Sequence, residues 1–141
     1  MATRDIGAGS TAKAGTDGGR TLRLALKTDA VASGGLGVLA LALGGLLDGP
    51  LGIPQSFLVA VGVFLLAYAA FLVVIATRPR VIAPAVWLVI VGNAAWVVAS
   101  VVFAFVDWYP LTTLGVVVVL AQAVAVAVLA EMQVIGLRKA S

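Results

Sequence analysis

The sequence contains no cysteine and no histidine among its 141 residues. Without cysteine it can form no disulfide, has no thiolate nucleophile, and cannot hold a metal or an iron–sulfur cluster through sulfur. Without histidine it lacks the usual haem ligand and the side chain that most often shuttles protons near neutral pH. These absences disfavour most redox and metal chemistry, and we expect no cofactor and no metal site.

Charged residues are also scarce, at 11% of the chain, whereas 62% of the residues are hydrophobic. The mean hydropathy of +1.17 is far from that of soluble globular domains, so the composition indicates a membrane protein. The pI near 9.8 therefore does not indicate a nucleic-acid partner. Basic residues of membrane proteins gather in cytoplasmic segments, where anionic headgroups attract them weakly. The expected partner is the lipid bilayer.

Four long apolar runs predict an all-α fold, a four-helix transmembrane bundle with up-down-up-down order, because about 20 apolar residues suffice to cross a bilayer. The expected helices lie at about 22–47, 55–77, 81–106 and 111–135, within a transmembrane domain at 22–137. Residues 1–21, rich in Gly, Ala, Ser and Thr, are expected to be a disordered cytoplasmic tail, and 138–141 a second, short tail. Short connections predict that consecutive helices are antiparallel neighbours.

The basic residues predict the orientation of this bundle. Because positive charge stays on the cytoplasmic side during insertion, both termini and the connection between the second and third helices are expected in the cytoplasm. Asp48 and Asp107 then lie outside, and the protein is assigned to a bacterial cytoplasmic membrane as a multi-pass protein. The basic residues are Arg4, Lys13, Arg20, Arg23, Lys27, Arg78, Arg80, Arg138 and Lys139.

Polar residues within the spans are candidate functional residues, because each must be satisfied inside the protein. Asp29 is expected at the cytoplasmic end of the first helix, pointing into the bundle. Two roles are open to it: a carboxylate that binds a proton, cation or ligand, or an interfacial ion pair with Arg23, Lys27, Arg78 or Arg80. At 100° per residue it shares one helix face with four small residues, whose expected role is close helix packing. These are Ser33, Gly37, Ala40 and Gly44.

Glu131 lies on the last helix at 180° from Gln122, while Gln133 shares the Gln122 face. If Gln122 faces the interior, Glu131 faces headgroups, a second protomer or another protein. Two roles are open to Glu131 as well: a charge neutralised by Arg138 or by reaching toward water, or a contact in an oligomer.

Depth along the helices places several polar side chains near the bilayer midplane. Tyr68, Asn93 and Gln122 are expected within about 4 Å of one level, and Trp96 and Ser100 continue the Asn93 face. This layer has two interpretations, a small polar pocket or a set of interhelical hydrogen bonds worth roughly 0.6 kcal/mol each.

Several short motifs carry a resemblance that covers residues 21–139. They are Leu24–Gly34 with its Asp-Ala-x-x-Ser-Gly core, Leu51–Pro54, Asn93–Trp96 with Ser100, Ala121–Ala123, and Glu131–Lys139 with Glu-Met-Gln-x-x-Gly-Leu-Arg. In these motifs the chain resembles a group of small bacterial four-span integral membrane proteins. The resemblance implies the fold and lends no activity.

Among function classes, a structural or accessory membrane protein is the first expectation, with contacts to itself or to a larger membrane complex. A small-solute or proton-coupled transporter that uses Asp29 and the midplane polar residues is the alternative. Small multidrug exporters also have four spans and an acidic residue in the first helix. However, the one-sided charge and the expected interfacial position of Asp29 argue against their antiparallel dimer. An enzyme is not expected, because no nucleophile with a base, paired carboxylates or phosphate-binding loop can be assembled.

Overall fold

The computed structural model of this protein describes the backbone of residues 2–140 and the side chains of residues 18–140. It contains four helices, each with a stretch long and apolar enough to cross a membrane. They are α1 (Ala2–Leu51), α2 (Gln55–Ala76), α3 (Ala83–Phe105) and α4 (Thr113–Ala140). No strand occurs in the described part of the chain. The predicted all-α class with four membrane-spanning helices is confirmed.

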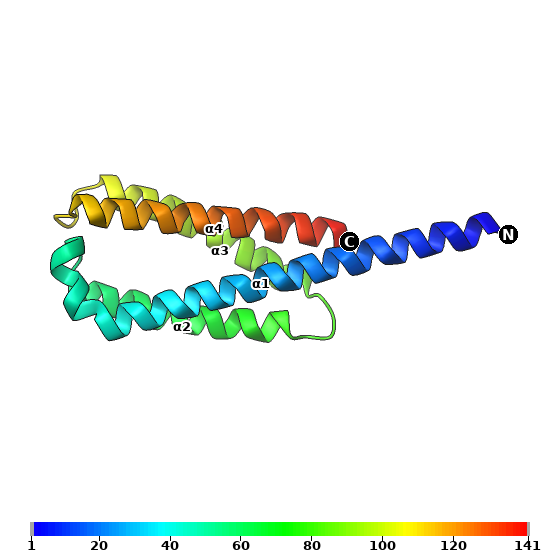
Figure 1. The fold of residues 1–141 in the computed structure, drawn as a ribbon, viewed down its shortest axis with the longest axis horizontal. Helices are drawn as coiled ribbons and strands as arrows, with labels where there is room; N and C mark the ends of the chain where they lie inside the picture. The colour runs from blue at the N-terminus through cyan, green and yellow to red at the C-terminus, as the bar shows by residue number, and fades with distance from the viewer. Residues whose placement is uncertain (1, 141) are drawn as a thin grey trace.

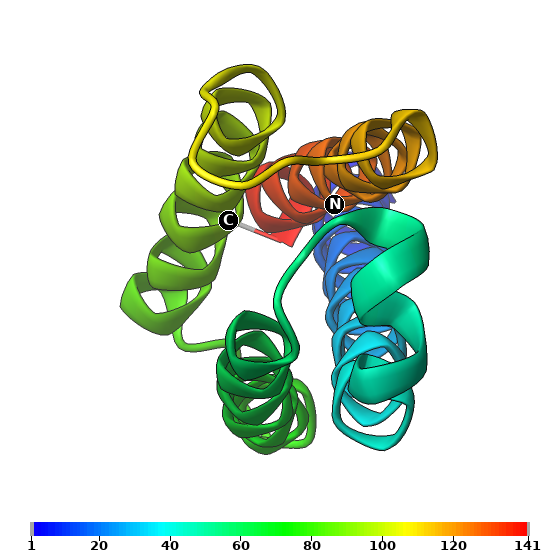
Figure 2. The same ribbon diagram turned by 90° about the vertical axis from the view of Figure 1, so that its left-hand side faces the viewer.

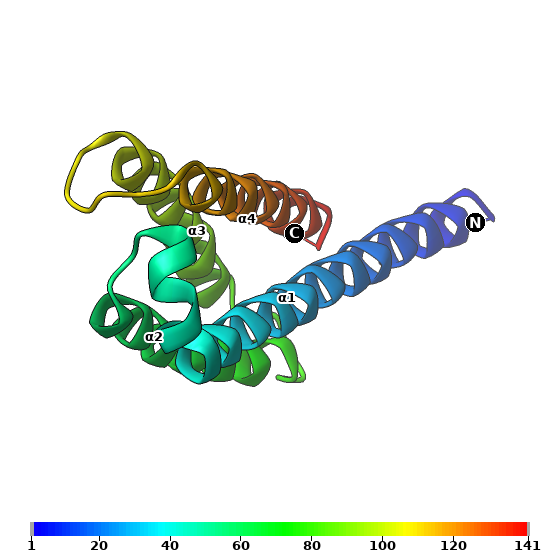
Figure 3. The ribbon, with the colours of Figure 1, turned by 60° about the vertical axis from the view of Figure 1, so that its left-hand side comes forward.

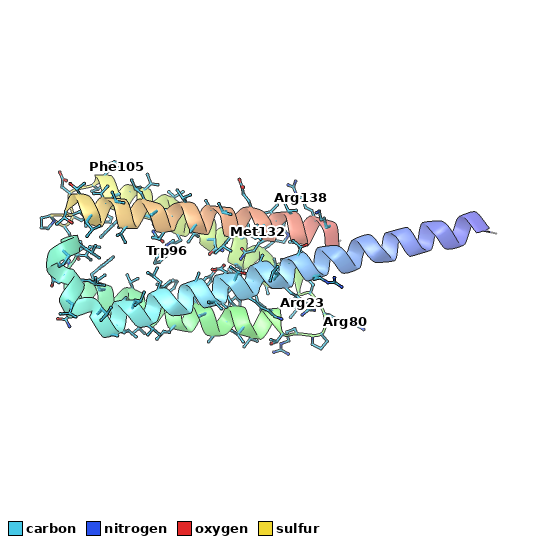
Figure 4. The ribbon with its side chains drawn as sticks, in the orientation of Figure 1. Arg23, Arg80, Trp96, Phe105, Met132 and Arg138 are labelled. Atoms are coloured by element: carbon cyan, nitrogen blue, oxygen red, sulfur yellow. The ribbon has the colours of Figure 1, made fainter. Side chains whose placement is uncertain are left out.

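The helices lie lengthwise beside one another, with the α1–α2 and α3–α4 connections at one end and the α2–α3 connection at the other (Figure 1). Arg23, Arg80 and Arg138 gather at the end with the α2–α3 connection (Figure 4), which we call the basic end. The opposite end carries Asp48 and Asp107, and we call it the acidic end. The basic side chains of residues 18–140 thus lie toward one end of the bundle, and two of its acidic side chains, Asp48 and Asp107, lie at the other.

Helix α1 begins at Ala2, not near residue 22, and its first turns project beyond the basic end (Figure 3). The expected disordered tail at residues 1–21 therefore differs from the helix described for residues 2–21, while Met1 lies outside the described residues. No proline interrupts this segment, so nothing blocks a helix there despite the cost of its glycines. Gly18 packs directly on the backbone of Lys139 and Ala140, which gives the segment support from α4.

Helix α4 continues through Gly136 to Ala140, where the sequence predicted an end at residue 135 and a tail at 138–141. Residues 138–140 are helical, and Ser141 lies outside the described residues. Gly136 is a packing residue: a Cβ atom added there would lie 2.7 Å from the backbone nitrogen of Leu22. The glycine lets α1 and α4 approach closely, so it does not terminate the helix.

Helices α2 and α3 are consecutive but make few backbone contacts, whereas α1 packs along both α2 and α4, and α4 along α3. The expectation that all consecutive helices are neighbours is wrong for this pair. Figure 2 shows α3 swinging away from α2 with distance from their connection. Long side chains bridge the two helices instead: the rings of Phe57 and Phe103 stack with centroids 5.1 Å apart. The physical reason is that a short loop fixes only one end of a helix pair.

The two connections at the acidic end hold each other. The hydroxyl of Thr112 donates a hydrogen bond to the carbonyl of Pro50 (2.6 Å) and accepts one from the backbone nitrogen of Gly115 (2.9 Å). Thr112 thus caps the first turn of α4 while it anchors the end of α1. Gly52 adopts a φ of 71°, a conformation that favours glycine, and a Cβ at Gly52 or at Gly115 would collide with the facing backbone.

Candidate functional site

Asp29 is buried inside the bundle, with 1% of its surface exposed. Its carboxylate accepts three hydrogen bonds. The hydroxyl of Ser33 donates to Oδ1 (3.1 Å), and the amides of Asn93 and Gln133 each donate to Oδ2 (2.8 Å). The donors come from α1, α3 and α4, and all three are neutral. The site therefore satisfies the oxygen atoms of a carboxylate without supplying a positive charge.

The other members of this site complete a closed network. Asn93 also donates to Oε1 of Gln133 (3.0 Å), and its own Oδ1 accepts a hydrogen bond from the hydroxyl of Tyr68 (2.8 Å). Because Tyr68 lies on α2, the network joins all four helices. We call these residues the Asp29 group: Asp29, Ser33, Tyr68, Asn93 and Gln133. Among residues 18–140, no buried side-chain nitrogen or oxygen lacks a hydrogen-bond partner.

The structure contradicts the ion-pair interpretation of Asp29. Arg23, one expected partner, donates instead to the carbonyls of Ala76 (2.8 Å) and Pro79 (3.1 Å). Within residues 18–140 no basic side chain pairs with Asp29. A cation near the last carbonyls of a helix interacts favourably with its dipole, which accounts for the position of Arg23 at the end of α2.

The same contacts correct the depth of Asp29. Arg23 marks the level at which α2 ends, and Asp29 follows it by six residues, or about 9 Å at 1.5 Å per residue. At and between these two levels lies a buried apolar cluster from all four helices. Its buried members include Leu22, Leu26, Leu72, Ile75, Val86, Val89 and Leu137. Asp29 is therefore not at the mouth of the bundle, because this cluster separates it from the basic end.

A second set of polar residues lies nearer the acidic end and joins only α3 and α4. Gln122 accepts a hydrogen bond from the indole nitrogen of Trp96 (2.8 Å) and donates to the hydroxyl of Ser100 (2.9 Å) and to the carbonyl of Val119 (2.7 Å). We call Trp96, Ser100 and Gln122 the Gln122 group. The single midplane layer expected from the sequence is wrong, because Tyr68 and Asn93 belong to the Asp29 group.

A cleft of about 380 Å³ lies on the acidic-end side of the Asp29 group, where α2 and α3 diverge. Ser33, Tyr68 and Asn93 contribute to its lining. Phe64 and Trp96 also line it, and their rings are stacked with centroids 5.9 Å apart. Of the pocket predicted from the sequence, Tyr68, Asn93 and Trp96 line this cleft, whereas Ser100 and Gln122 do not. The cleft thus has an aromatic wall and a polar end that contacts the partners of Asp29.

The small residues of α1 face α2. A Cβ at Gly37 would lie 3.0 Å from the carbonyl oxygen of Gly62, and one at Gly44 would lie 3.6 Å from the side chain of Leu58. Ala40 is buried on the same face, whereas Ser33 is engaged by Asp29. This face is consumed by packing within the chain, so it does not present a surface to a second copy.

The α4 residues divide as their helical spacing predicts. Gln133 is fully buried in the Asp29 group and Gln122 is partly buried, whereas Glu131 is exposed on the opposite face. No basic residue pairs with Glu131 within residues 18–140. Gln133 was not assigned to a site from the sequence, although it shares a helix face with Gln122, and this shared face could have predicted that it points into the bundle.

Comparisons with family profiles, curated proteins and solved structures found no match to this chain.

Proposed function

We propose that this protein is a carrier in a bacterial cytoplasmic membrane that binds a proton or a small organic cation at Asp29. One observation carries the proposal: Asp29 is buried among neutral donors, and no basic side chain of residues 18–140 pairs with it. The transporter alternative from the sequence is thus favoured. The basic residues at one end support an orientation with both termini in the cytoplasm.

The proposal rests on the cost of burying a lone charge. An ionised carboxylate in a low-dielectric interior is strongly unfavourable unless it is paired, and hydrogen bonds from neutral groups offset only part of that cost. A bound cation completes the compensation, and a bound proton removes the charge. Either ligand competes for the same oxygen atoms, so binding one releases the other. Acidic residues within membrane spans serve ion and proton pathways in this way.

The cleft favours a particular class of cation. The positively charged group of a solute at the polar end of the cleft would lie beside Tyr68 and Asn93, where the negative charge of Asp29 attracts it. The faces of Phe64 and Trp96 attract cations and also pack against an apolar body. Phe64 is 55% exposed, so the cleft borders the bilayer, from which an amphipathic solute can enter. We therefore infer that the solute carries one positive charge on a small apolar or aromatic body.

The two sides of the Asp29 group differ in access, which favours a carrier over a fixed scaffold. The cleft reaches the partners of Asp29 from one side, whereas the apolar cluster around Leu26 and Leu72 closes the side toward the basic end. A site open to one side and closed to the other is what alternating access requires of each of its states. Movement of α3 against α2, the consecutive pair with the fewest backbone contacts, would exchange the open and the closed side.

The test uses full-length protein in sealed proteoliposomes with a pH-sensitive dye inside. A potassium diffusion potential drives protons, and the rate of internal pH change is measured for the wild type, Asp29→Asn and Gln122→Leu. We expect Asp29→Asn to fall to the rate of empty liposomes and Gln122→Leu to keep most of the wild-type rate. In detergent, calorimetry should show binding of tetraphenylphosphonium, weaker binding of neutral triphenylphosphine oxide, and loss of that preference in Asp29→Asn.

Gln122→Leu is the matched control because it removes a partly buried polar side chain of the same bundle that forms no hydrogen bond with Asp29. All variants should elute as single species by size exclusion before they are compared. If Asp29→Asn is well folded and equals the wild type in both proton flux and cation binding, the carrier proposal is wrong.

A second candidate function, the structural or accessory role, is supported by Glu131. This acidic side chain is exposed on α4 within an apolar span, where it contacts either lipid or another protein. It has no basic partner in residues 18–140. A basic residue of another membrane protein would compensate it. Native mass spectrometry of protein extracted gently from its membrane tests this role. A stoichiometric partner or defined homo-oligomer that disappears in Glu131→Gln supports it, and an unchanged assembly state contradicts it.

A further inference from the structure

The first turns of α1 with described side chains, from residue 18 onward, carry three basic residues on one face. At 100° per residue, Arg20, Arg23 and Lys27 fall within an arc of about 60°, and the apolar Leu24 lies beside them. Asp29 lies at about 180° from Arg20 on the same helix, buried in the bundle. Among residues 18–140, Asp29 is the acidic residue of α1 nearest in sequence to this basic face, and it points away from it.

This face borders a surface pocket of about 680 Å³ at the basic end. One wall is α1, and the other is the α2–α3 connection. The lining residues are Gly19, Arg20, Arg23, Leu24, Lys27, Pro79 and Val81. A Cβ added at Gly19 would meet nothing within 4 Å, so the pocket is open above this glycine. The pocket is independent of the Asp29 group, which lies beyond the apolar cluster.

The three basic residues have different tasks. Arg23 is held by the carbonyls of Ala76 and Pro79, so it ties α1 to the end of α2 and forms a fixed base of the pocket. Arg20 and Lys27 are exposed, and neither pairs with an acidic side chain of residues 18–140. Two exposed cationic groups therefore flank a fixed one, an arrangement that complements a phosphate and its neighbouring oxygens.

The position of the pocket identifies the source of that phosphate. Arg23 lies at the level where α2 ends, which is the boundary between the apolar spans and the polar connection. Leu24, 61% exposed, and Val81 add apolar surface to the same pocket. A soluble anion would gain nothing from these residues, whereas a lipid would place its acyl chains along them. We propose that an anionic phospholipid binds here, with its headgroup phosphate between Arg20 and Lys27.

The proposal is more specific than attraction of a basic end to a negative membrane. Diffuse attraction is worth about 1 kcal/mol for each basic residue near the surface wherever the residue lies. A site instead depends on the residues that line the pocket. Arg78 and Arg138 are exposed at the same end and are not part of the lining, so they provide a control with the same change of charge.

The experiment measures lipid retention by native mass spectrometry on full-length protein in detergent, with phosphatidylglycerol and phosphatidylcholine of identical acyl chains in equal amounts. Three proteins are compared: the wild type, Arg20→Gln/Lys27→Gln, and Arg78→Gln/Arg138→Gln. Arg23 is left unchanged because it holds the end of α2. We expect the wild type to retain phosphatidylglycerol at least five-fold over phosphatidylcholine, the first double variant to lose this preference, and the second to keep it.

Three outcomes would overturn the proposal. Absence of a preference in the wild type would mean that the pocket does not select an anionic headgroup. Equal loss in both double variants would mean diffuse electrostatic attraction. Displacement of phosphatidylglycerol by millimolar inorganic phosphate would identify a site for a soluble anion. Matching circular dichroism and elution of the three proteins ensures that a lost preference does not report unfolding.

Discussion

The two polar groups of this bundle use similar residues for different purposes. The Gln122 group is neutral and joins two neighbouring helices by hydrogen bonds between an amide, an indole and a hydroxyl. The Asp29 group joins four helices and has a carboxylate at its centre. Neutral hydrogen bonds between membrane helices contribute modestly to stability, whereas a buried carboxylate makes its partners far more important. The comparison teaches that a buried charged group, more than the number of hydrogen bonds, distinguishes a candidate ligand site from polar residues that only hold helices together.

The largest expected effect is that of Asn93→Ala. This change removes one donor to Asp29 and one to Gln133 and leaves the hydroxyl of Tyr68 without its acceptor. Breaking a buried network around a charge costs about 3 kcal/mol. Equilibrium unfolding in mixed micelles with increasing sodium dodecyl sulfate measures the change in free energy. If Asn93→Ala loses no more stability than Gln122→Ala, the Asp29 group is not energetically distinct.

Asp29→Asn should have the opposite sign. The amide oxygen can accept the hydrogen bonds of Asn93 and Gln133, and the amide nitrogen can donate to the hydroxyl of Ser33. The shape and contacts are kept while an uncompensated charge is removed, so we expect the free energy of unfolding to rise by about 1 to 2 kcal/mol. The same unfolding measurement checks this. A loss of stability larger than that of Gln122→Ala would mean that Asp29 has a cationic partner in the purified protein.

Gln122→Leu should reduce stability by about 1 kcal/mol, since three interhelical or local bonds of roughly 0.6 kcal/mol are lost and the leucine regains apolar packing. Trp96 is only partly buried, so its indole nitrogen can find another partner. Unfolding in mixed micelles measures the change, with Ala123→Val on the same helix as a control for packing. A loss of 3 kcal/mol or more would place the Gln122 group on a level with the Asp29 group.

The smallest expected effect within the Asp29 group is that of Ser33→Ala, at about 0.5 kcal/mol, because Asp29 keeps both bonds to Oδ2 and the remaining bond is the longest of the three (3.1 Å). Ser100→Ala is the matched control in the Gln122 group. Comparing the two serines refines the contrast, since a larger loss for Ser100 would show that the charge of Asp29 does not strengthen its hydrogen bonds.

Much of the fold could be predicted because membrane helices follow local rules. The existence and type of all four helices follow from the length and hydropathy of the runs, since every backbone group must be satisfied within its own segment. The helix ends were predicted less accurately. Gly136 has the signature of a helix end, but its lack of a side chain serves the approach of Leu22. A glycine has the same local preference in both roles, so only the neighbouring helix distinguishes them.

The sequence identified polar residues of the candidate site but did not predict which of them contact one another. The sequence singled out Asp29, Tyr68, Asn93 and Gln122 as polar residues in apolar surroundings. It did not show which of them meet, because depth along a helix is an unreliable guide when helices begin at different levels. In the structure Asp29 lies at the level of Asn93 and Gln133, whereas Gln122 forms its hydrogen bond with Trp96.

The sequence by itself determined that this chain is a four-span helical membrane protein, and it placed the basic residues that predict the orientation. Both follow from the solvent: hydrocarbon excludes charge and demands closed backbone hydrogen bonding, and each segment meets these demands alone. Only the tertiary structure decided that Asp29 is enclosed by neutral donors and that α2 and α3 part to leave a cleft. These features depend on the relative level and tilt of different helices, which packing between their faces sets.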